Sequence, residues 1–284
     1  MIDRRGFVAL TFAFGGMGTQ LLASRDTRDV IAIGGDVTEI IFALNQGHRL
    51  LARDTTSTYP AAARDLPDVG YMRRLSAEGV LSFAPSLIVS AEGAGPPEVI
   101  DILRAASVEF AEIPTGYDAE AIAQKIHAVG AALAVPGKAA KLTADTHAAL
   151  TAAVDRAART DAMPKRVLFV LSTQGGRILA SGTNTGAHGI IQMAGGTNAV
   201  SEFEGYKPLS DEAVSAAAPD VILMMDRSGD HAATDEELFA LPAISSTPAA
   251  QSGDVVRMNG LLLLGFGPRT ADAVTALNRA LYPT

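Results

Sequence analysis

The chain has 284 residues, 48% of them hydrophobic and 19% charged, and its 31 Asp and Glu against 23 Lys and Arg give a net charge of −8. The length suits one large or two modest domains, and the acidic balance argues against nucleic acid as a partner, because neutralising phosphates requires clustered cations. The chain contains no cysteine, which excludes disulfides, thiolate metal sites and a cysteine nucleophile.

The first residues have the order of an export signal. Arg4 and Arg5 precede a glycine-rich apolar run that ends near Ser24, and a positive start, an apolar run and small residues are typical of a secretory signal. The arginine pair followed by Phe7 resembles a twin-arginine signal. We therefore expect residues 1–26 to be a signal peptide and the mature protein to be periplasmic. A buried N-terminal helix is the alternative.

The first half of the mature chain alternates short apolar runs with helical patterns. Alternation of this kind predicts an α/β fold with a largely parallel sheet. The expected strands are 30–33, 49–52, 87–90 and 108–110, and the expected helices are 36–44 (capped by Asp36 or Thr38), 100–106 and 119–133.

A long alanine-rich segment follows. Residues 136–162 contain no proline after Pro136, and Pro164 ends the segment, so we expect one long helix. A second α/β set comes next, with strands at 166–171 and 221–224 and helices at 190–194 and 269–281. The sequence thus predicts two Rossmann-like lobes, residues 27–135 and 164–284, joined by a single long helix, residues 136–163, with a ligand cleft between the lobes.

One sequence pattern occurs once in each expected lobe. Residues 75–89, which begin Leu75-Ser76-Ala77-Glu78, and residues 209–223, which begin Leu209-Ser210-Asp211-Glu212, match in register through an Ala-Pro pair to an apolar strand. Each serine can cap a short helix, and each glutamate lies in its first turn. The repetition indicates two related lobes that face each other.

Several segments resemble the solute-binding proteins of ABC importers that have a rigid helical linker, the cobalamin, siderophore and haem group. The most specific is Val69-Gly70-Tyr71-Met72-Arg73-Arg74-Leu75-Ser76, which resembles the haemin-binding branch. Residues 33–41, 91–96 and 205–210 are also similar to that group. The resemblance implies capture of haem between the lobes and delivery to the permease of an ABC importer for haem and iron uptake.

The resemblance also implies a set of ligand-binding residues. Ferric haem requires an oxygen or nitrogen ligand, and tyrosinate is a known axial ligand, so Tyr71 is the expected iron ligand. Arg73 or Arg74 can favour the phenolate or pair with a propionate, and the resemblance favours Arg73. Tyr59 and Tyr206 fall in segments expected to face the ligand, where each can stack on the porphyrin.

The sequence offers two candidates for the second axial ligand of the haem iron. His188 is the nearest candidate in the second lobe, and Met258 is a weaker one. The histidines do not form a paired metal-ligand spacing; they are His48, His127, His147, His188 and His231. A carrier of a bare metal ion is therefore disfavoured.

Glu78 and Glu212 match between the two copies of the repeated pattern. In the family that the chain resembles, one acidic residue on each lobe docks with arginines of the permease, so we expect this role here. We expect a carrier of haem, which is its transported ligand and not a catalytic cofactor, and no enzyme activity. A ferric-siderophore or corrinoid carrier of the same fold is one alternative, and an α/β enzyme with an inter-lobe active site is another.

Overall fold

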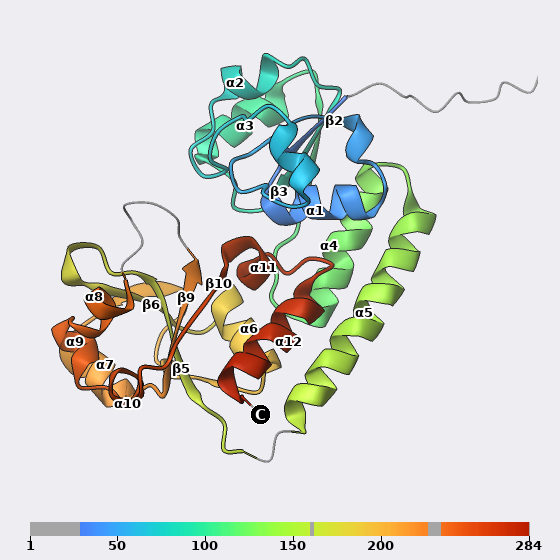
Figure 1. Cartoon of the computed structure of the whole chain (residues 1–284). Helices are drawn as coiled ribbons and strands as arrows, with labels where there is room; N and C mark the ends of the chain where they lie inside the picture. Colours follow the sequence, from blue (N-terminus) through green and yellow to red (C-terminus); the bar gives the residue numbers. More distant parts are fainter. Residues whose placement is uncertain (1–28, 160–161, 227–233, 284) are drawn as a thin grey trace, which may run out of the picture.

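The computed structural model describes residues 29–159, 162–226 and 234–283. The expected signal peptide, residues 1–26, lies outside these described residues. Figure 1 shows two lobes, one above the other in this view, with the helix α5 (Pro136–Ala158) running beside them. The chain therefore has the two-lobe α/β fold that the sequence predicted.

The N-terminal lobe is built on a parallel sheet of four strands in the order β2-β1-β3-β4. Its strands are β1 (Val30–Ile33), β2 (Leu50–Arg53), β3 (Leu87–Ala91) and β4 (Glu109–Ile113). Its helices are α1 (Gly35–Ala43), α2 (Ala77–Leu81), α3 (Pro97–Ala105) and α4 (Ala119–Ala132), with short 3₁₀ turns at Gly47–Arg49 and Ala61–Asp65.

Alternating side chains of these strands fill two separate cores. Val30 and Ala32 of β1 belong to the core on the α1 and α4 side, whereas Ile31 and Ile33 belong to the core that contains Leu103 of α3. Successive side chains of a strand point to opposite faces of its sheet, so a strand that is apolar at every position must be covered on both faces. The continuous apolar runs in the sequence are therefore explained by helices on both sides.

The C-terminal lobe contains a mixed sheet rather than a largely parallel one. The order is β10-β9-β5-β6-β8, with β7 also paired to β5, and β6 and β8 run antiparallel to their neighbours. The strands are β5 (Arg166–Ser172), β6 (Ile178–Ser181), β7 (Thr197–Asn198), β8 (Tyr206–Leu209), β9 (Val221–Asp226) and β10 (Val255–Asn259). The largely parallel sheet expected for the first half of the mature chain is thus confirmed in the N-terminal lobe, and the antiparallel strands of the second sheet were not predicted.

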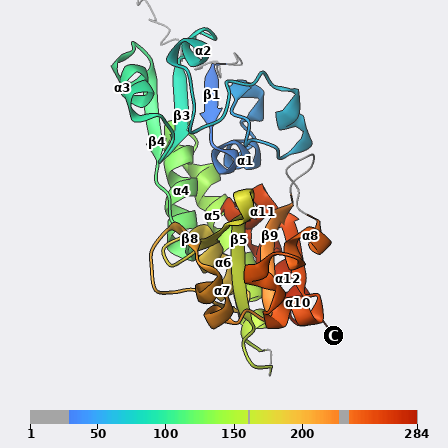
Figure 2. The same cartoon turned by 90° about the vertical axis from the view of Figure 1, so that its left-hand side faces the viewer.

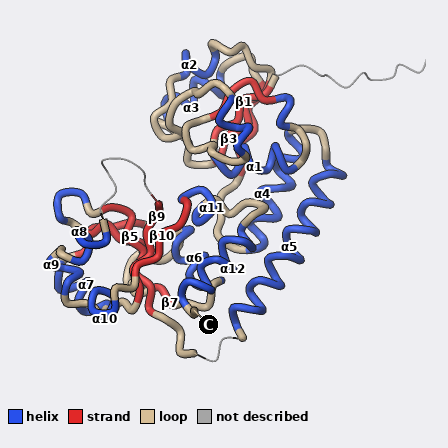
Figure 3. The backbone as a smooth tube through the Cα atoms, in the orientation of Figure 1, coloured by secondary structure: helices blue, strands red, loops and turns tan. Residues whose placement is uncertain are grey.

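Helices cover both faces of the second sheet (Figure 3). On one face lie α6 (Gly186–Met193) and α12 (Thr270–Leu281); on the other lie α7 (Asp211–Ala217), α8 (Asp235–Phe239), α9 (Pro242–Ser245) and α10 (Pro248–Ser252). The helix α11 (Gly260–Leu264) follows β10 directly, and a 3₁₀ turn at Gln174–Gly176 follows β5.

The helix α5 connects the lobes by packing along α4 and α12. It ends at Ala158, earlier than the expected helix of residues 136–162, and residues 160–161 are not described. Leu150 and Ala153 of α5 belong to one apolar core that also contains Val30 of the first sheet and Val167 of the second. This core continues from one lobe to the other, so it does not mark where one lobe ends and the next begins. The expected limits of the lobes, residues 27–135 and 164–284, and of the linking helix, residues 136–163, stay a prediction.

The start of α1 differs from the expectation. The cap residue is Gly34, with φ 112° and no side-chain cap, and Asp36 and Thr38 lie inside the helix. The turn from β1 into α1 is too tight for a side chain at residue 34, since a Cβ there would lie 2.8 Å from that of Ala91. Asp36 pairs with Lys125 instead, and the Thr38 hydroxyl bonds to another side chain.

The repeated sequence pattern has the same local structure in both lobes. The hydroxyl of Ser76 accepts from the Gly79 amide at 3.3 Å, and that of Ser210 accepts from the Ala213 amide at 3.2 Å. An alanine with positive φ stands directly before the proline that leads to each strand: Ala84, with φ 48°, lies three residues beyond the end of α2, and Ala218, with φ 40°, is the C-cap of α7. The predicted caps are confirmed at both sites.

Candidate functional site

The carboxyl ends of the parallel strands face the junction between the lobes, those of β1 and β3 in the first sheet and those of β5, β9 and β10 in the second. β1 leads through Gly34 into α1, and β10 leads into α11. A Cβ at Gly35 would lie 2.7 Å from a methyl group of Leu261, so α1 and α11 meet closely (Figure 1). In open α/β sheets the ligand binds beyond the carboxyl ends of the strands. The loops at this junction therefore form the candidate site.

The loop after β2 is held by the fully buried carboxylate of Asp54. This carboxylate accepts hydrogen bonds from the amides of Gly34 and Thr56 at 3.0 and 2.9 Å, and from the hydroxyls of Thr56 and Ser57, both at 2.7 Å. Four bonds satisfy most of the acceptor sites of a carboxylate. The backbone that leads to Tyr59 is thus fixed against the start of α1, and the Tyr59 side chain remains 43% exposed.

An arginine of the second lobe lies on this tyrosine. The guanidinium carbon of Arg269 is 3.4 Å from the ring centroid of Tyr59, and an Arg269 Nη donates to Glu39 of α1 at 2.6 Å. Glu39 is 5% exposed. Sequence reasoning identified Tyr59 but neither Glu39 nor Arg269, and no sequence signal links two residues so distant in the chain.

Tyr71 projects from a loop whose neighbours point inward. Val69 and Leu75 are buried, whereas the Tyr71 side chain is 43% exposed. The loop is joined to its neighbours by backbone hydrogen bonds, from the Thr55 amide to the Gly70 carbonyl at 3.0 Å and from the Leu75 amide to the Gly95 carbonyl at 2.9 Å. Inward apolar residues and fixed backbone together present the phenol to solvent in a defined place.

Arg73 on the same loop interacts with Tyr206 at the start of β8. Tyr206 is 38% exposed, and its partial burial raises the pKa of the phenol above its usual value. The Tyr117 phenol raises the pKa further, and the Arg73 cation and hydrogen bonds with Ser181 and Thr185 lower it in part. The Tyr206 ring also packs edge-on against Phe169, with centroids 6.3 Å apart. Arg73 of the first lobe and Tyr206 of the second are therefore close to each other, and Tyr71 lies two residues from Arg73 on the same loop.

Tyr117 forms part of the contact between the lobes beneath these loops. Its ring meets Phe266 of the second lobe edge-on at 5.4 Å. A Cβ at Gly189 of α6 would lie 2.5 Å from the Tyr117 carbonyl oxygen, so the two segments touch. The sequence analysis did not identify Tyr117 as a candidate site residue. Its position shortly after β4 was the one sequence feature that could have indicated it.

The two candidates for a second axial ligand are held by local structure. The Nδ1 atom of His188 lies 3.4 Å from the side-chain amide nitrogen of Asn198. The backbone amide of His188 donates a hydrogen bond to the hydroxyl of Thr185, the cap of α6. Met258 is 8% exposed and belongs to the core that spans the lobes. A ligand role for His188 stays a prediction, and the burial of Met258 disfavours it.

The two glutamates expected to dock with a permease lie on α2 and α7, one on each lobe. Both helices are on the left-hand side of Figure 1, away from α5, and both are visible in Figure 2. Glu78 and Glu212 are exposed in the first turn of their helices. The backbone amide of Glu212 and the Ser210 hydroxyl lower the pKa of the Glu212 carboxyl below its usual value.

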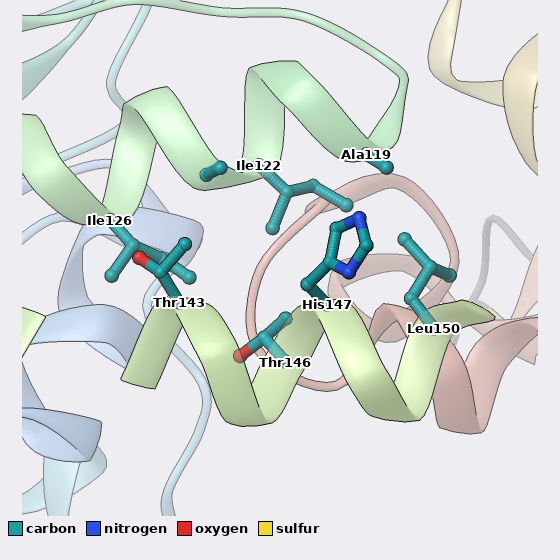
Figure 4. Close-up of a pocket in the computed structure, with 8 residues that line it drawn as sticks. Ala119, Ile122, Ile126, Thr143, Thr146, His147 and Leu150 are labelled. Atoms are coloured by element: carbon teal, nitrogen blue, oxygen red, sulfur yellow. The ribbon is translucent and has the colours of Figure 1, made fainter. Parts of the chain in front are cut away.

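The described residues contain no group of three or more His, Asp or Glu side chains that could hold a metal ion, and His231 lies outside them. A small cavity does lie between α4 and α5 (Figure 4), lined by Ile122, Ile126, Thr143 and Leu150 among others. Its free volume of about 10 Å³ is roughly that needed by one water molecule. No helix among the described residues has the length and apolar character that crossing a membrane requires.

Residues 30–260 match the family model of periplasmic binding proteins, and the chain belongs to this family. Three similar proteins indicate which members it resembles. The structure superposes with TM-score 0.85 on the periplasmic heme-binding protein BhuT in complex with two hemes, at 42% identity over 90% of this chain and 98% of that one.

The second similar structure is the apo form of the periplasmic heme-binding protein RhuT from Roseiflexus sp. RS-1, with TM-score 0.86 and 39% identity, covering 90% of this chain and 98% of that one. The vitamin B12-binding protein of Yersinia pestis is 26% identical over 226 residues, which is 78% of each chain. These matches extend over both lobes of the fold.

Proposed function

We propose that this protein is a periplasmic carrier that binds haem at the junction of its two lobes and delivers it to an ABC importer, without acting on it as an enzyme. The observation that carries the proposal is the exposed Tyr71 phenol, presented by a fixed loop beside Arg73, whose charge reaches Tyr206 of the opposite lobe. The 42% identity to a heme-binding protein over 90% of the chain supports it.

In this proposal the Tyr71 oxygen is the axial ligand of the ferric iron, since phenolate oxygen is a known haem ligand. Arg73 pairs with a propionate or stabilises the phenolate, because a guanidinium forms charge-assisted hydrogen bonds with carboxylates. Tyr206 acts as a neutral wall, because a phenol is protonated at neutral pH and burial raises the pKa of this one further. His188 is the candidate for a second ligand when haem draws the lobes' loops together.

Titration of the purified apoprotein with haemin tests the proposal. We expect a shifted Soret band with the charge-transfer bands of a high-spin ferric tyrosinate. Tyr71→Phe keeps the ring and removes the oxygen, so those bands should disappear and affinity should fall by at least about 100-fold, since even loss of groups that only orient a metal ligand lowers affinity 10–100-fold.

Tyr59→Phe is the matched control, because Tyr59 and Tyr71 have the same exposed fraction, 43%. The control should keep the tyrosinate bands. Bands that survive in Tyr71→Phe would overturn the ligand assignment. If the apoprotein bound cyanocobalamin and left haemin free, it would be a corrinoid carrier like the relative from Yersinia pestis.

A further inference from the structure

We propose that Arg269 is a positioning residue that sets the orientation of the Tyr59 ring, so that the open face of this ring forms one wall of the haem site. The inference rests on the proposed function, because it names a wall of that site. Arg269 comes from the second lobe and Tyr59 from the first, so the wall exists only when the lobes are joined as they are here.

The guanidinium of Arg269 is itself fixed by Glu39. One Nη of Arg269 donates to a Glu39 oxygen at 2.6 Å, and the Arg269 backbone amide donates to the other oxygen at 3.3 Å. The Glu39 side chain is 6% exposed and that of Arg269 is 22% exposed. An ion pair with two hydrogen bonds in a place shielded from water has a defined geometry.

The face of the guanidinium is used by Tyr59. Its carbon lies 3.4 Å from the ring centroid, closer than the 6 Å limit of a cation–π contact. The buried Arg269 Nε forms no hydrogen bond within the described residues, so the hydrogen bond that orients the guanidinium is that of its Nη to Glu39. Arg269 covers one face of the Tyr59 ring, and Tyr59 is still 43% exposed. We therefore infer that the exposed area lies mainly on the opposite face and the edge of the ring.

The loop backbone is held by contacts that do not involve Arg269. Asp54 accepts its four hydrogen bonds from residues of this loop and of the turn before α1, and the Ser57 hydroxyl is 2.7 Å from that of Thr38. Removal of the guanidinium should therefore free the Tyr59 ring to rotate while the backbone stays in place. This separates a positioning role from a purely structural one.

A second ion pair at the lobe junction supplies the matched control. Lys125 pairs with Asp36 and also donates to the Gly265 carbonyl of the second lobe at 3.0 Å. This link is as buried as the one to Glu39, with Lys125 at 3% and Asp36 at 16% side-chain exposure. The structure gives neither Lys125 nor Asp36 a contact with Tyr59.

The experiment measures the haemin affinity of Arg269→Lys and Arg269→Gln. Each variant is made both with Tyr59 present and in a Tyr59→Leu background, and Asp36→Asn is the control. Lysine keeps the charge but not the planar group. We expect Arg269→Lys to weaken haemin binding by about five- to tenfold, the scale of a desolvated cation–π contact, and by less than about twofold when Tyr59 is already leucine. Asp36→Asn should lower the melting temperature and leave haemin affinity within about twofold.

Near-UV circular dichroism of the apoproteins provides a readout without haem, because the chain has five tyrosines and no tryptophan. Arg269→Lys should change the tyrosine signal, and the change should vanish in the Tyr59→Leu background. Equal weakening of haemin binding in both backgrounds, or an unchanged tyrosine signal, would overturn the inference and leave Arg269 as a link between lobes. A wild-type protein that binds no haemin would refute the proposed function, and the dichroism would still decide the position of Tyr59.

Discussion

Arg73 of the first lobe and Tyr206 of the second interact across the lobe junction, and the Arg73 cation offsets part of the effect of burial on the Tyr206 phenol. Burial is the largest influence, so the net result is a raised pKa. The phenol is therefore kept neutral in the folded protein under conditions in which a free tyrosine begins to ionise.

This raised pKa has a consequence for stability at high pH. A free tyrosine ionises near pH ~10, so between that pH and the higher folded-state value the unfolded chain binds fewer protons than the folded one. Stability due to Tyr206 is therefore fully present below pH ~10 and is lost as the pH rises through the folded-state pKa. Tyr206→Phe should make the fall in unfolding free energy above pH ~10 shallower, as measured by urea denaturation from pH ~8 to ~11. Parallel curves for wild type and variant would contradict this, and Tyr59→Phe is the control.

Asp54 should be the most sensitive polar residue of the site loops. Asp54→Asn keeps the size of the side chain but replaces an acceptor with a donor that faces the Gly34 or Thr56 amide. Loss of charge-assisted bonds and a buried mismatch should lower the free energy of unfolding by about 2–4 kcal/mol. Asp68→Asn is the matched control, because its pair with Arg53 is partly exposed and should contribute less than about 1 kcal/mol. Similar losses in the two variants would argue against a special role for Asp54.

Leu150 tests the core that joins the lobes. It is 2% exposed on α5 and packs in the core shared by both sheets. Leu150→Ala should lower the free energy of unfolding by about 2–5 kcal/mol through lost burial and a cavity. Lys141→Ala on the same helix removes only an exposed pair with Asp145 and should change stability by less than about 0.5 kcal/mol. Chemical denaturation measures both, and a Leu150→Ala loss as small as that of Lys141→Ala would refute the packing role.

Glu78 and Glu212 should act on delivery and not on binding. Both are exposed on helices of different lobes, so reversal of both to lysine should abolish haem-dependent growth or uptake while haemin affinity stays within about twofold of wild type. Reversal of the exposed Glu98 and Glu120 provides a control with the same charge change. Normal uptake by the Glu78 and Glu212 variant would exclude their docking role.

The sequence was sufficient for elements with strong apolar runs. Residues 30–33 form β1 within the bounds expected, and the strands at 87, 166 and 221 begin where predicted. It failed for β6 and β8. The strand β8 is mostly exposed and contains Pro208, which weakens the strand signal, and β6 is a run of only four residues, Ile178–Ser181. The antiparallel pairing of β6 with β5 and with β8 was therefore not predicted.

Candidate site residues could be found where they follow a strand or belong to a recognisable segment, as with Tyr59, Tyr71 and Tyr206. Their roles remain predictions. Glu39 and Arg269 could not be found, because their pairing depends on how α1 and the start of α12 approach one another in space. A helical pattern shows that Glu39 is near apolar residues but not which cation neutralises it.

Because one apolar core extends from Val30 through Leu150 to Val167, we expect the two lobes to unfold as a single cooperative unit. Each half of the chain, severed within α5, would keep one core of its own, but each would expose to water the part of the shared core that normally lies against the other half. A chimaera that combines lobes of two relatives to change the ligand preference would therefore require that α4, α5 and α12 come from the same parent.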